Sequence, residues 1–352
     1  MTGRDLGAAL AVAEEAARWA QRHITSRRPG PGDPEEKAGP GDWVTSVDRE
    51  VEEHIRAALL AAFPGDVVIG EEAGRSEGAG PDGGEQAAGA GPDGGEQAAG
   101  AGPDGGEQAA GAGPDGADGA AAGLAQAGDG GLTWYIDPID GTTNFVHGLP
   151  GVSVSIAAVD AGGVAVGVVH DVYRDEAFTA IRGRGARVDG VAVAAGGEGD
   201  RVGLRGGLLL TEWSGLLPWP GMYGLITDLQ ERFTATRVLG SCALSLASVG
   251  AGRATGAVLG GHYNPWDVLA GALIAAEAGC VVFDPDGVAG DVPMGGLGVA
   301  RPDVADEIRR AWQQARARAA DAAADDGATA DDGATAGVPG GRVGTGEAEA
   351  AP

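Results

Sequence analysis

The chain has 352 residues and a formal net charge of −27 at pH 7, a balance that repels nucleic acids and anionic membranes. Its two cysteines make no disulfide framework, and it shows neither a signal peptide nor an apolar run long enough to span a membrane. We therefore expect a cytoplasmic protein without nucleic-acid or membrane partners, which would need cations to bind a phosphate group.

Two segments differ from the rest of the chain in composition. Residues 75–130 and 319–352 carry −15 of the net charge between them and have almost no large apolar side chains. The first contains the unit GPDGGEQAAGA three times in succession, with no apolar face on which repeats could stack, so a flexible loop is favoured over a solenoid. We expect a disordered insert over 75–130, a disordered acidic tail over 319–352, and one folded domain made of 1–74 and 131–318.

The spacing of apolar residues predicts the folded elements. Before the insert we expect, in chain order, a helix over 5–24, a loop over 29–40, a helix over 46–63 and a strand over 67–69. After it we expect strands over 134–136, 152–159, 164–169, 176–181, 186–193 and 207–211, a helix over 222–232, a strand over 236–239, a helix over 241–250, a strand over 254–259, a buried helix over 267–278, strands over 280–283 and 297–300, and a helix over 302–318. Interleaved helices and hairpins are typical of a layered α/β or α+β architecture.

The sequence Asp137-Pro-Ile-Asp140-Gly-Thr-Thr follows directly on an apolar strand. Its proline stiffens the turn, and Gly141 allows the backbone to approach a ligand closely. Thr142 would begin a helix, whose free N–H groups favour an anion. Hard carboxylate oxygens beside such a helix start suit a Mg²⁺-dependent phosphatase, whereas an Asp-rich turn that only caps a helix is the simpler alternative.

Three further acids stand at the ends of predicted elements. Glu71 follows a short buried strand, Asp48 lies in a capping box with Thr45, and Asp267 begins an apolar helix. Each alone has a plain explanation, as a solvated surface acid or as a helix cap. Together with the two aspartates of the turn they favour one metal site, because acids at element ends can meet in a single cavity.

Four stretches resemble the inositol monophosphatase family, whose members are Mg²⁺-dependent and typically lithium-sensitive phosphatases, and they occur in the family's order. They are Asp42-Trp-Val-Thr-Ser-Val-Asp48, Ile69-Gly-Glu-Glu72, Trp134-Tyr-Ile-Asp-Pro-Ile-Asp-Gly-Thr-Thr-Asn-Phe145 and Trp266-Asp-Val-Leu-Ala-Gly271. Outside the insert, the resemblance covers about residues 25–318, and the bias toward Arg over Lys suggests a bacterial member. The resemblance implies an α/β/α/β/α sandwich of the inositol monophosphatase/fructose-1,6-bisphosphatase type, commonly a homodimer.

The resemblance also implies a role for each matching residue. Two to three Mg²⁺ ions would be held by Glu71, Asp137, the carbonyl of Ile139, Asp140 and Asp267. Activation of the attacking water would fall to Thr142, Asp48 and Glu71. Phosphate and substrate would be bound by Lys37, Asp140, Gly141, Thr142, Ser241, Cys242 and Asp267. Lys37 is the only lysine in the chain, and a plain surface charge is the simpler explanation for it.

The implied reaction is hydrolysis of a small phosphorylated metabolite, with myo-inositol 1-phosphate as the first candidate. Gly260 stands where inositol-specific members carry a sugar-binding glutamate, so histidinol phosphate, fructose 1,6-bisphosphate and 3′-phosphoadenosine 5′-phosphate remain alternatives on the same scaffold. His262 and Asn264 are either replacement contacts or plain loop residues. A non-catalytic metal- or phosphate-binding scaffold is a further alternative, disfavoured because none of the expected acids is missing.

Deleting residues 80–116 should lower the melting temperature by less than about 4 °C, the shift that corresponds to roughly 1 kcal/mol in a chain of this size. The repeats offer no apolar face to pack, and shortening a loop changes its closure entropy little. Scanning calorimetry of the deleted and full chains makes the comparison. A much larger fall would mean that the repeats pack against the folded domain.

Overall fold

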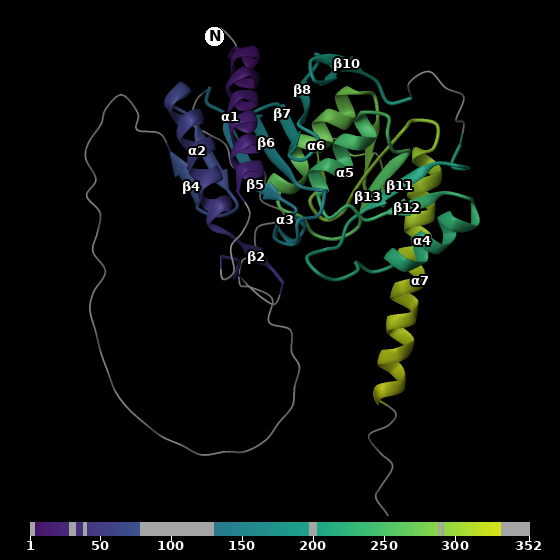
Figure 1. The fold of residues 1–352 in the computed structure, drawn as a ribbon. Helices are drawn as coiled ribbons and strands as arrows, with labels where there is room; N and C mark the ends of the chain where they lie inside the picture. The colour runs from purple at the N-terminus through teal and green to yellow at the C-terminus, as the bar shows by residue number, and fades with distance from the viewer. Residues whose placement is uncertain are drawn as a thin grey trace, which may run out of the picture.

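The chain folds into alternating layers of helices and sheets (Figure 1). This computed structural model describes residues 4–27, 33–37, 41–77, 130–196, 203–287, 289 and 292–331. The paired helices of the three helical layers are α1 (Leu6–Ser26) with α2 (Ser46–Ala62), α5 (Cys242–Gly250) with α6 (Pro265–Glu277), and α4 (Met222–Glu231) with α7 (Ala305–Asp331). The central pair, α5 and α6, lies between the two sheets, so the predicted α/β/α/β/α sandwich is confirmed.

The larger sheet has eight strands in the order β10-β9-β8-β7-β6-β5-β3-β4. Their bounds are β3 (Val67–Gly70), β4 (Gly74–Glu77), β5 (Thr133–Asp140), β6 (Ser153–Asp160), β7 (Gly163–Asp171), β8 (Glu176–Ile181), β9 (Ala186–Val188) and β10 (Val191–Val193). Every neighbouring pair is antiparallel except β3 and β5, which run parallel. The C-terminal ends of β3 and β5 therefore meet at one edge of the sheet.

The smaller sheet has five strands in the order β12-β11-β13-β15-β14. Their bounds are β11 (Leu208–Thr211), β12 (Ala235–Arg237), β13 (Gly256–Leu259), β14 (Val281–Phe283) and β15 (Leu297–Ala300). A separate ribbon pairs β1 (Glu35–Glu36) with β2 (Trp43–Val44), and the short helix α3 (Thr142–His147) follows β5 directly. The chain after β12 leads straight into α5, which brings the smaller sheet next to the end of β5.

Helix α6 is the packing centre of the molecule. It is apolar nearly all round, as its sequence indicates, and its residues Val268 to Ala275 are all buried. One side contacts strands of the larger sheet and the other contacts β14 and β15 of the smaller one. A helix that is apolar on all sides is buried on all sides, and here the two sheets and α5 surround it.

Four sequence-based predictions are wrong in their boundaries. Residues 75–77, assigned to the insert, form most of β4 and pair antiparallel with β3; residues 78–129 lie outside the described ranges. The loop predicted over 29–40 contains β1, and the strand predicted over 186–193 is two strands joined by a turn. The helix predicted to end at 318 continues to Asp331, although the tail was expected to be disordered from residue 319.

These differences have simple physical causes. β4 is polar, but its backbone completes the ladder beside β3, and that pairing needs no apolar side chain. Residues 319–331 are rich in Ala, the strongest helix former, and extending an existing helix needs no new nucleus. Within the described ranges, no helix is both long enough and apolar enough to cross a bilayer.

Candidate active site

The parallel pair β3 and β5 brings the first two predicted ligands together. Gly70 at the end of β3 is in register with Ile136 of β5, and the backbone N–H of Glu71 donates to the Ile136 carbonyl at 3.2 Å. Glu71 and Asp137 thus follow the same register position on adjacent strands. The sequence analysis predicted that acids at the ends of elements meet, and this pair does so because parallel strands end at the same edge of a sheet.

An irregularity in β5 separates Asp137 from Asp140. Between them the register with β6 shifts, so that Asp137 faces Ser155 and Asp140 faces Ser153. The backbone N–H of Ile139 donates to Asp137 Oδ1 at 3.0 Å, which folds the turn back on its own first carboxylate. Both aspartates are buried, at 3% and 8% exposed, so neither has the solvation of an ordinary surface acid.

The carboxylate of Asp140 is held from α5. Its Oδ2 accepts the Ser241 hydroxyl at 2.6 Å and the Ala243 N–H at 2.8 Å, and its Oδ1 accepts the Cys242 N–H at 3.2 Å. A carboxylate on the N-terminus of a helix is stabilised by the free N–H groups and the helix dipole. Burial nevertheless raises the pKa of Asp140 to about 6 against these donors.

Asp267 approaches the same region from the first turn of α6. Its Oδ2 accepts the Asn264 N–H at 2.8 Å, which closes the capping box that its sequence position indicates. Burial, and then repulsion by Asp140 and Glu71, raises the pKa of Asp267 well above its usual value. Burial followed by repulsion from Glu71, Asp140 and Asp267 does the same to the pKa of Asp137. The four predicted acidic ligands therefore act on one another as one charge cluster.

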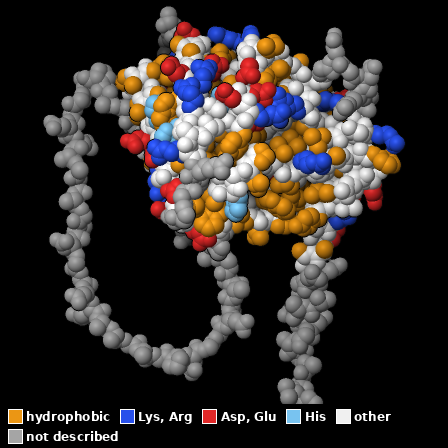
Figure 2. All heavy atoms as spheres, in the orientation of Figure 1, with side chains coloured by type: hydrophobic (Ala, Val, Ile, Leu, Met, Phe, Trp, Pro, Cys, Tyr) orange, Lys and Arg blue, Asp and Glu red, His pale blue; other side chains and the backbone are white. Residues whose placement is uncertain are grey.

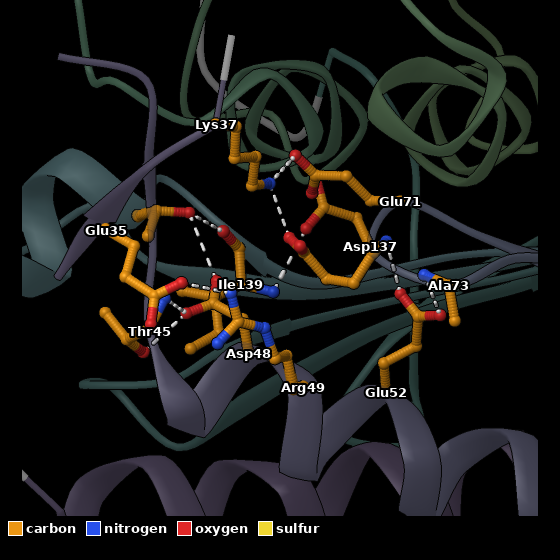
Figure 3. A network of polar contacts seen from close by, with 12 residues as sticks. Glu35, Lys37, Thr45, Asp48, Arg49, Glu52, Glu71, Ala73, Asp137 and Ile139 are labelled. Atoms are coloured by element: carbon orange, nitrogen blue, oxygen red, sulfur yellow. Dashed lines mark hydrogen bonds and ion pairs between the residues drawn. The ribbon is translucent and has the colours of Figure 1, made fainter. Parts of the chain in front are cut away.

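Lys37 lies against this cluster and is more than a plain surface charge. Its ammonium donates to Glu71 Oε1 at 2.7 Å and also contacts Glu72 (Figure 3). Burial lowers the pKa of Lys37, but attraction to Glu71 and Glu72 outweighs it, so the net pKa rises. The ribbon of β1 and β2 carries Lys37 to this position, since its N–H donates to the carbonyl of Asp42 across the turn.

Asp48, Thr142 and Ile139 form a second contact at the start of α2 (Figure 3). Asp48 is fully buried, and its Oδ2 accepts both the N–H and the hydroxyl of Thr45. The Thr142 hydroxyl donates to the Ile139 carbonyl at 2.9 Å and lies 3.4 Å from Asp48 Oδ1. With one proton to give, Thr142 is bonded mainly to the carbonyl, and Asp48 is its longer contact. Burial raises the pKa of Asp48 to about 6.

The structure reveals two functional candidates that the sequence reading missed, Glu52 and Glu212. Glu52 accepts the N–H groups of Glu72 and Ala73 at 2.7 and 2.9 Å and so holds the turn that presents Glu71. Glu212 directly follows β11 and accepts the N–H groups of Leu239 and Gly240 in the loop before α5. Both have a detectable signal: Glu52 is a charge on the apolar face of its helix, and Glu212 is an acid directly after an apolar strand.

The residues present suit a divalent cation in kind, though not yet in arrangement. Hard carboxylate oxygens are the ligands that Mg²⁺ prefers, and their mutual repulsion in a buried place is relieved by a cation. Among the described residues, however, no three His, Cys, Asp or Glu side chains converge closely enough to hold one ion as they stand. The ligand set therefore stays a prediction.

Comparison with known proteins agrees with this arrangement. A family model described as "Inositol monophosphatase family" matches residues 5–323. The chain belongs to the inositol monophosphatase family. Members of this family are phosphoric monoester hydrolases and generally depend on Mg²⁺.

Individual relatives carry several names. The chain is 38% identical over 181 residues to "Inositol monophosphatase 1" of Solanum lycopersicum, covering 51% of this chain and 66% of that protein. It is 32% identical over 271 residues to "Nus factor SuhB" of Pasteurella multocida, covering 76% and 81%. A Thermotoga maritima protein named "Fructose-1,6-bisphosphatase/inositol-1-monophosphatase" is 40% identical over 158 residues, covering 44% and 57%.

Solved structures show the same fold. A Thermotoga maritima IMPase superposes with a TM-score of 0.65 at 26% identity, covering 87% of this chain and 96% of that one. The extragenic suppressor protein suhB from Bartonella henselae gives a TM-score of 0.66 at 25% identity, covering 87% and 98%. These solved structures therefore share the fold of this chain.

Replacing Asp48 by Asn should raise the free energy of unfolding in EDTA at pH 7.5. At pH 4 the substitution should give almost no gain. Because burial raises the folded pKa of Asp48 above the unfolded 3.8, its contribution to stability is complete below pH 3.8 and is lost as the pH rises through about 6. The gain at pH 7.5 is at most about 3 kcal/mol, since each pKa unit corresponds to about 1.4 kcal/mol.

Urea unfolding of the wild-type and Asp48→Asn proteins at both pH values measures this difference. Asn keeps an oxygen to accept the Thr45 N–H, so the helix cap survives the substitution. Asp33, which is only half-buried, provides the control variant Asp33→Asn, which should change little at either pH. An Asp48→Asn protein that is less stable than wild type at pH 7.5 would contradict the argument.

Proposed function

We propose that this protein is a Mg²⁺-dependent phosphomonoesterase that hydrolyses a small phosphorylated metabolite, with myo-inositol 1-phosphate as the leading candidate. The observation that carries the proposal is the charge cluster of Glu71, Asp137, Asp140 and Asp267, which come from three separate places in the sequence. Burial and repulsion within the cluster raise the pKa of the three aspartates. Such a cluster destabilises the fold on its own and is favoured only where cations bind.

Bound Mg²⁺ would polarise the phosphate, lower the pKa of the attacking water and stabilise the departing alkoxide. The side chains around it have complementary tasks. Thr142, within reach of both the Ile139 carbonyl and Asp48, would orient the water and pass on its proton. Asp48 can accept that proton only when it is ionised. Because its pKa is about 6, activity should need a pH above about 6.

The phosphate would lie at the start of α3, where the resemblance to the family implies that the N–H groups of Gly141 and Thr142 bind it. Gly141 is the N-cap of α3 with a φ of +97°, a conformation that side chains rarely adopt. A Cβ at this position would lie 2.4 Å from the carbonyl oxygen of Gly151. The glycine is therefore required by the packing of this turn as well as by access of a ligand.

The substrate is less constrained than the reaction. A Cβ built on Gly260 would lie 2.3 Å from the Trp219 indole, so the place of the family's sugar-binding glutamate is filled. Asn264 has a structural role as the cap of α6, which leaves His262 as the candidate replacement contact. Fructose 1,6-bisphosphate is the second candidate, since one relative's printed name joins that activity with inositol monophosphatase.

Purified protein should release phosphate from at least one member of a panel containing myo-inositol 1-phosphate, fructose 1,6-bisphosphate, histidinol phosphate and 3′-phosphoadenosine 5′-phosphate. Release should require Mg²⁺, stop with EDTA and decrease with lithium. Asp140→Asn should lower kcat by a factor of about 10³ or more because it removes a charged ligand. Its far-UV circular dichroism should match wild type.

Asp160→Asn provides the matched control for that substitution. Asp160 is also a strand-end aspartate but pairs with Arg182 away from the cluster, and its variant should keep full activity. A fully active Asp140→Asn protein would show that the assigned site is wrong. No release from any compound, with Mg²⁺ still bound, would favour the non-catalytic scaffold.

We also infer that the chain forms a homodimer, as commonly found in the family. Hydrophobic side chains gather in one continuous area of the face shown in Figure 2. Exposed large apolar side chains in the described ranges include Leu149, Trp213, Leu216, Leu217, Tyr223, Phe233 and Val238.

Sedimentation equilibrium should give twice the chain mass, and Leu217→Glu should shift the protein toward the monomer. A monomer at all concentrations would contradict the inference.

A further inference from the structure

The two residues Leu239 and Gly240 form the last link between the smaller sheet and α5. Immediately after them come Ser241, Cys242 and Ala243, whose hydroxyl and N–H groups bind the carboxylate of Asp140. Any shift of this link therefore moves the donors that orient Asp140. What fixes the link decides how that carboxylate is aimed.

Glu212 holds the link from the side of the smaller sheet. Its Oε1 accepts the N–H of Leu239 at 3.0 Å and its Oε2 accepts the N–H of Gly240 at 2.8 Å. The Ser245 hydroxyl, in the first turns of α5, lies 2.5 Å from Oε1. Glu212 is only 2% exposed, and burying a carboxylate is unfavourable unless its oxygens accept hydrogen bonds, as both do here.

Asn144 holds the same link from the side of α3. Its Nδ2 donates to the Leu239 carbonyl at 2.8 Å and to the Gly151 carbonyl at 2.8 Å. A Cβ on Gly240 would lie 2.6 Å from this Nδ2, and a Cβ on Gly151 would lie 2.4 Å from the Leu239 oxygen. The link is thus bonded through its N–H groups on one side and its carbonyl on the other, with no room for a side chain between.

The consequence falls on the two oxygens of Asp140. Oδ2 accepts the hydroxyl of Ser241, the N–H of Ala243 and, at 3.3 Å, the hydroxyl of Ser153. Among the described residues, Oδ1 accepts only the Cys242 N–H. A carboxylate has about four acceptor positions, so Oδ1 is the oxygen with capacity left for another partner. The bonds from the α5 end select which oxygen faces that partner.

We propose that Glu212 is a positioning residue for the reaction, which fixes the Leu239–Gly240 link so that α5 aims Asp140 Oδ1 at the cation. Asn144 supports the same link from the opposite side. The inference rests on the proposed function in taking the cation to be Mg²⁺. Glu212 itself touches neither the cation nor the substrate, because its carboxylate oxygens are bonded to the link and to Ser245.

Glu212→Gln tests the proposal with little change of shape. The Gln amide would place its NH₂ group against one of the N–H groups of the link. Two donors would then face each other, so one hydrogen bond to the link is lost and the two groups repel. Groups that orient metal ligands typically change metal affinity by 10- to 100-fold, so the Kd for Mg²⁺ should rise about tenfold or more. The kcat should fall and should recover in part when Mg²⁺ is raised above the new Kd.

Glu277→Gln is the matched control. Glu277 at the end of α6 also accepts two backbone N–H groups, from Gly183 at 2.7 Å and Gly185 at 2.8 Å, but it anchors the turn between β8 and β9. Its variant loses the same kind of bond and should have a lower melting temperature. It should nevertheless bind Mg²⁺ and turn over as wild type does.

Titration calorimetry with MgCl₂ on the full chain, well below each melting temperature, gives the Kd without relying on activity. An unchanged Kd and kcat in Glu212→Gln, or equal changes in Glu277→Gln, would overturn the proposal. If Glu212→Gln does not fold, Asn144→Ala and Ser245→Ala replace it, and each should raise the Kd by a smaller factor.

The same measurements separate this inference from the proposed function. If the wild-type protein binds Mg²⁺ but hydrolyses none of the compounds, the proposed function is wrong. The comparison of Kd values then still decides whether Glu212 positions Asp140. Wild type that binds no Mg²⁺ overturns both. Active wild type with indistinguishable Gln variants overturns only the positioning role.

Discussion

The structure depends on keeping several carboxylates close together in a buried region. Each such group prefers to be neutral there, which is why burial raises the pKa of Asp48, Asp137, Asp140 and Asp267. The fold offsets this with fixed N–H donors: two capping boxes, the start of α5 and the N–H of Ile139, which Asp137 accepts. These donors fix the orientation of the carboxylates that they bind, so part of the site is preorganised by the fold itself.

The layered architecture is what makes this concentration of charge possible. One parallel pair in an otherwise antiparallel sheet places Glu71 beside Asp137, and the helices between the sheets bring Asp267 and the α5 donors to the same edge. The close approach needs backbone against backbone, with Gly141, Gly151 and Gly240 at the contact. A side chain at any of the three would separate α3 from α5 and open the cluster.

The sequence predicted the layers and the cluster acids because both have local signals. Interleaved helices and hairpins indicate a layered architecture, an all-apolar helix indicates a buried one, and acids directly after strands or in helix caps indicate a shared edge. It failed where the cause is not local. The pairing of β4 depends on the free edge of β3, and the role of Glu52 depends on a turn 20 residues further along the chain. Glu212 follows a strand as Glu71 does, but its partner loop lies 27 residues away and has no pattern of its own.

The substrate is the part of the function that local signals reach least, and the structure gives the reason. Position 260 cannot accept a side chain while Trp219 fills its space, and Gly261 is equally closed by Ser214, since a Cβ there would lie 2.3 Å from the serine side chain. Trp219 is itself fixed in the outer core against Trp312. A side chain at position 260 therefore requires Trp219 to move out of the core, and a single Gly→Glu change there would collide with Trp219 before it met a substrate.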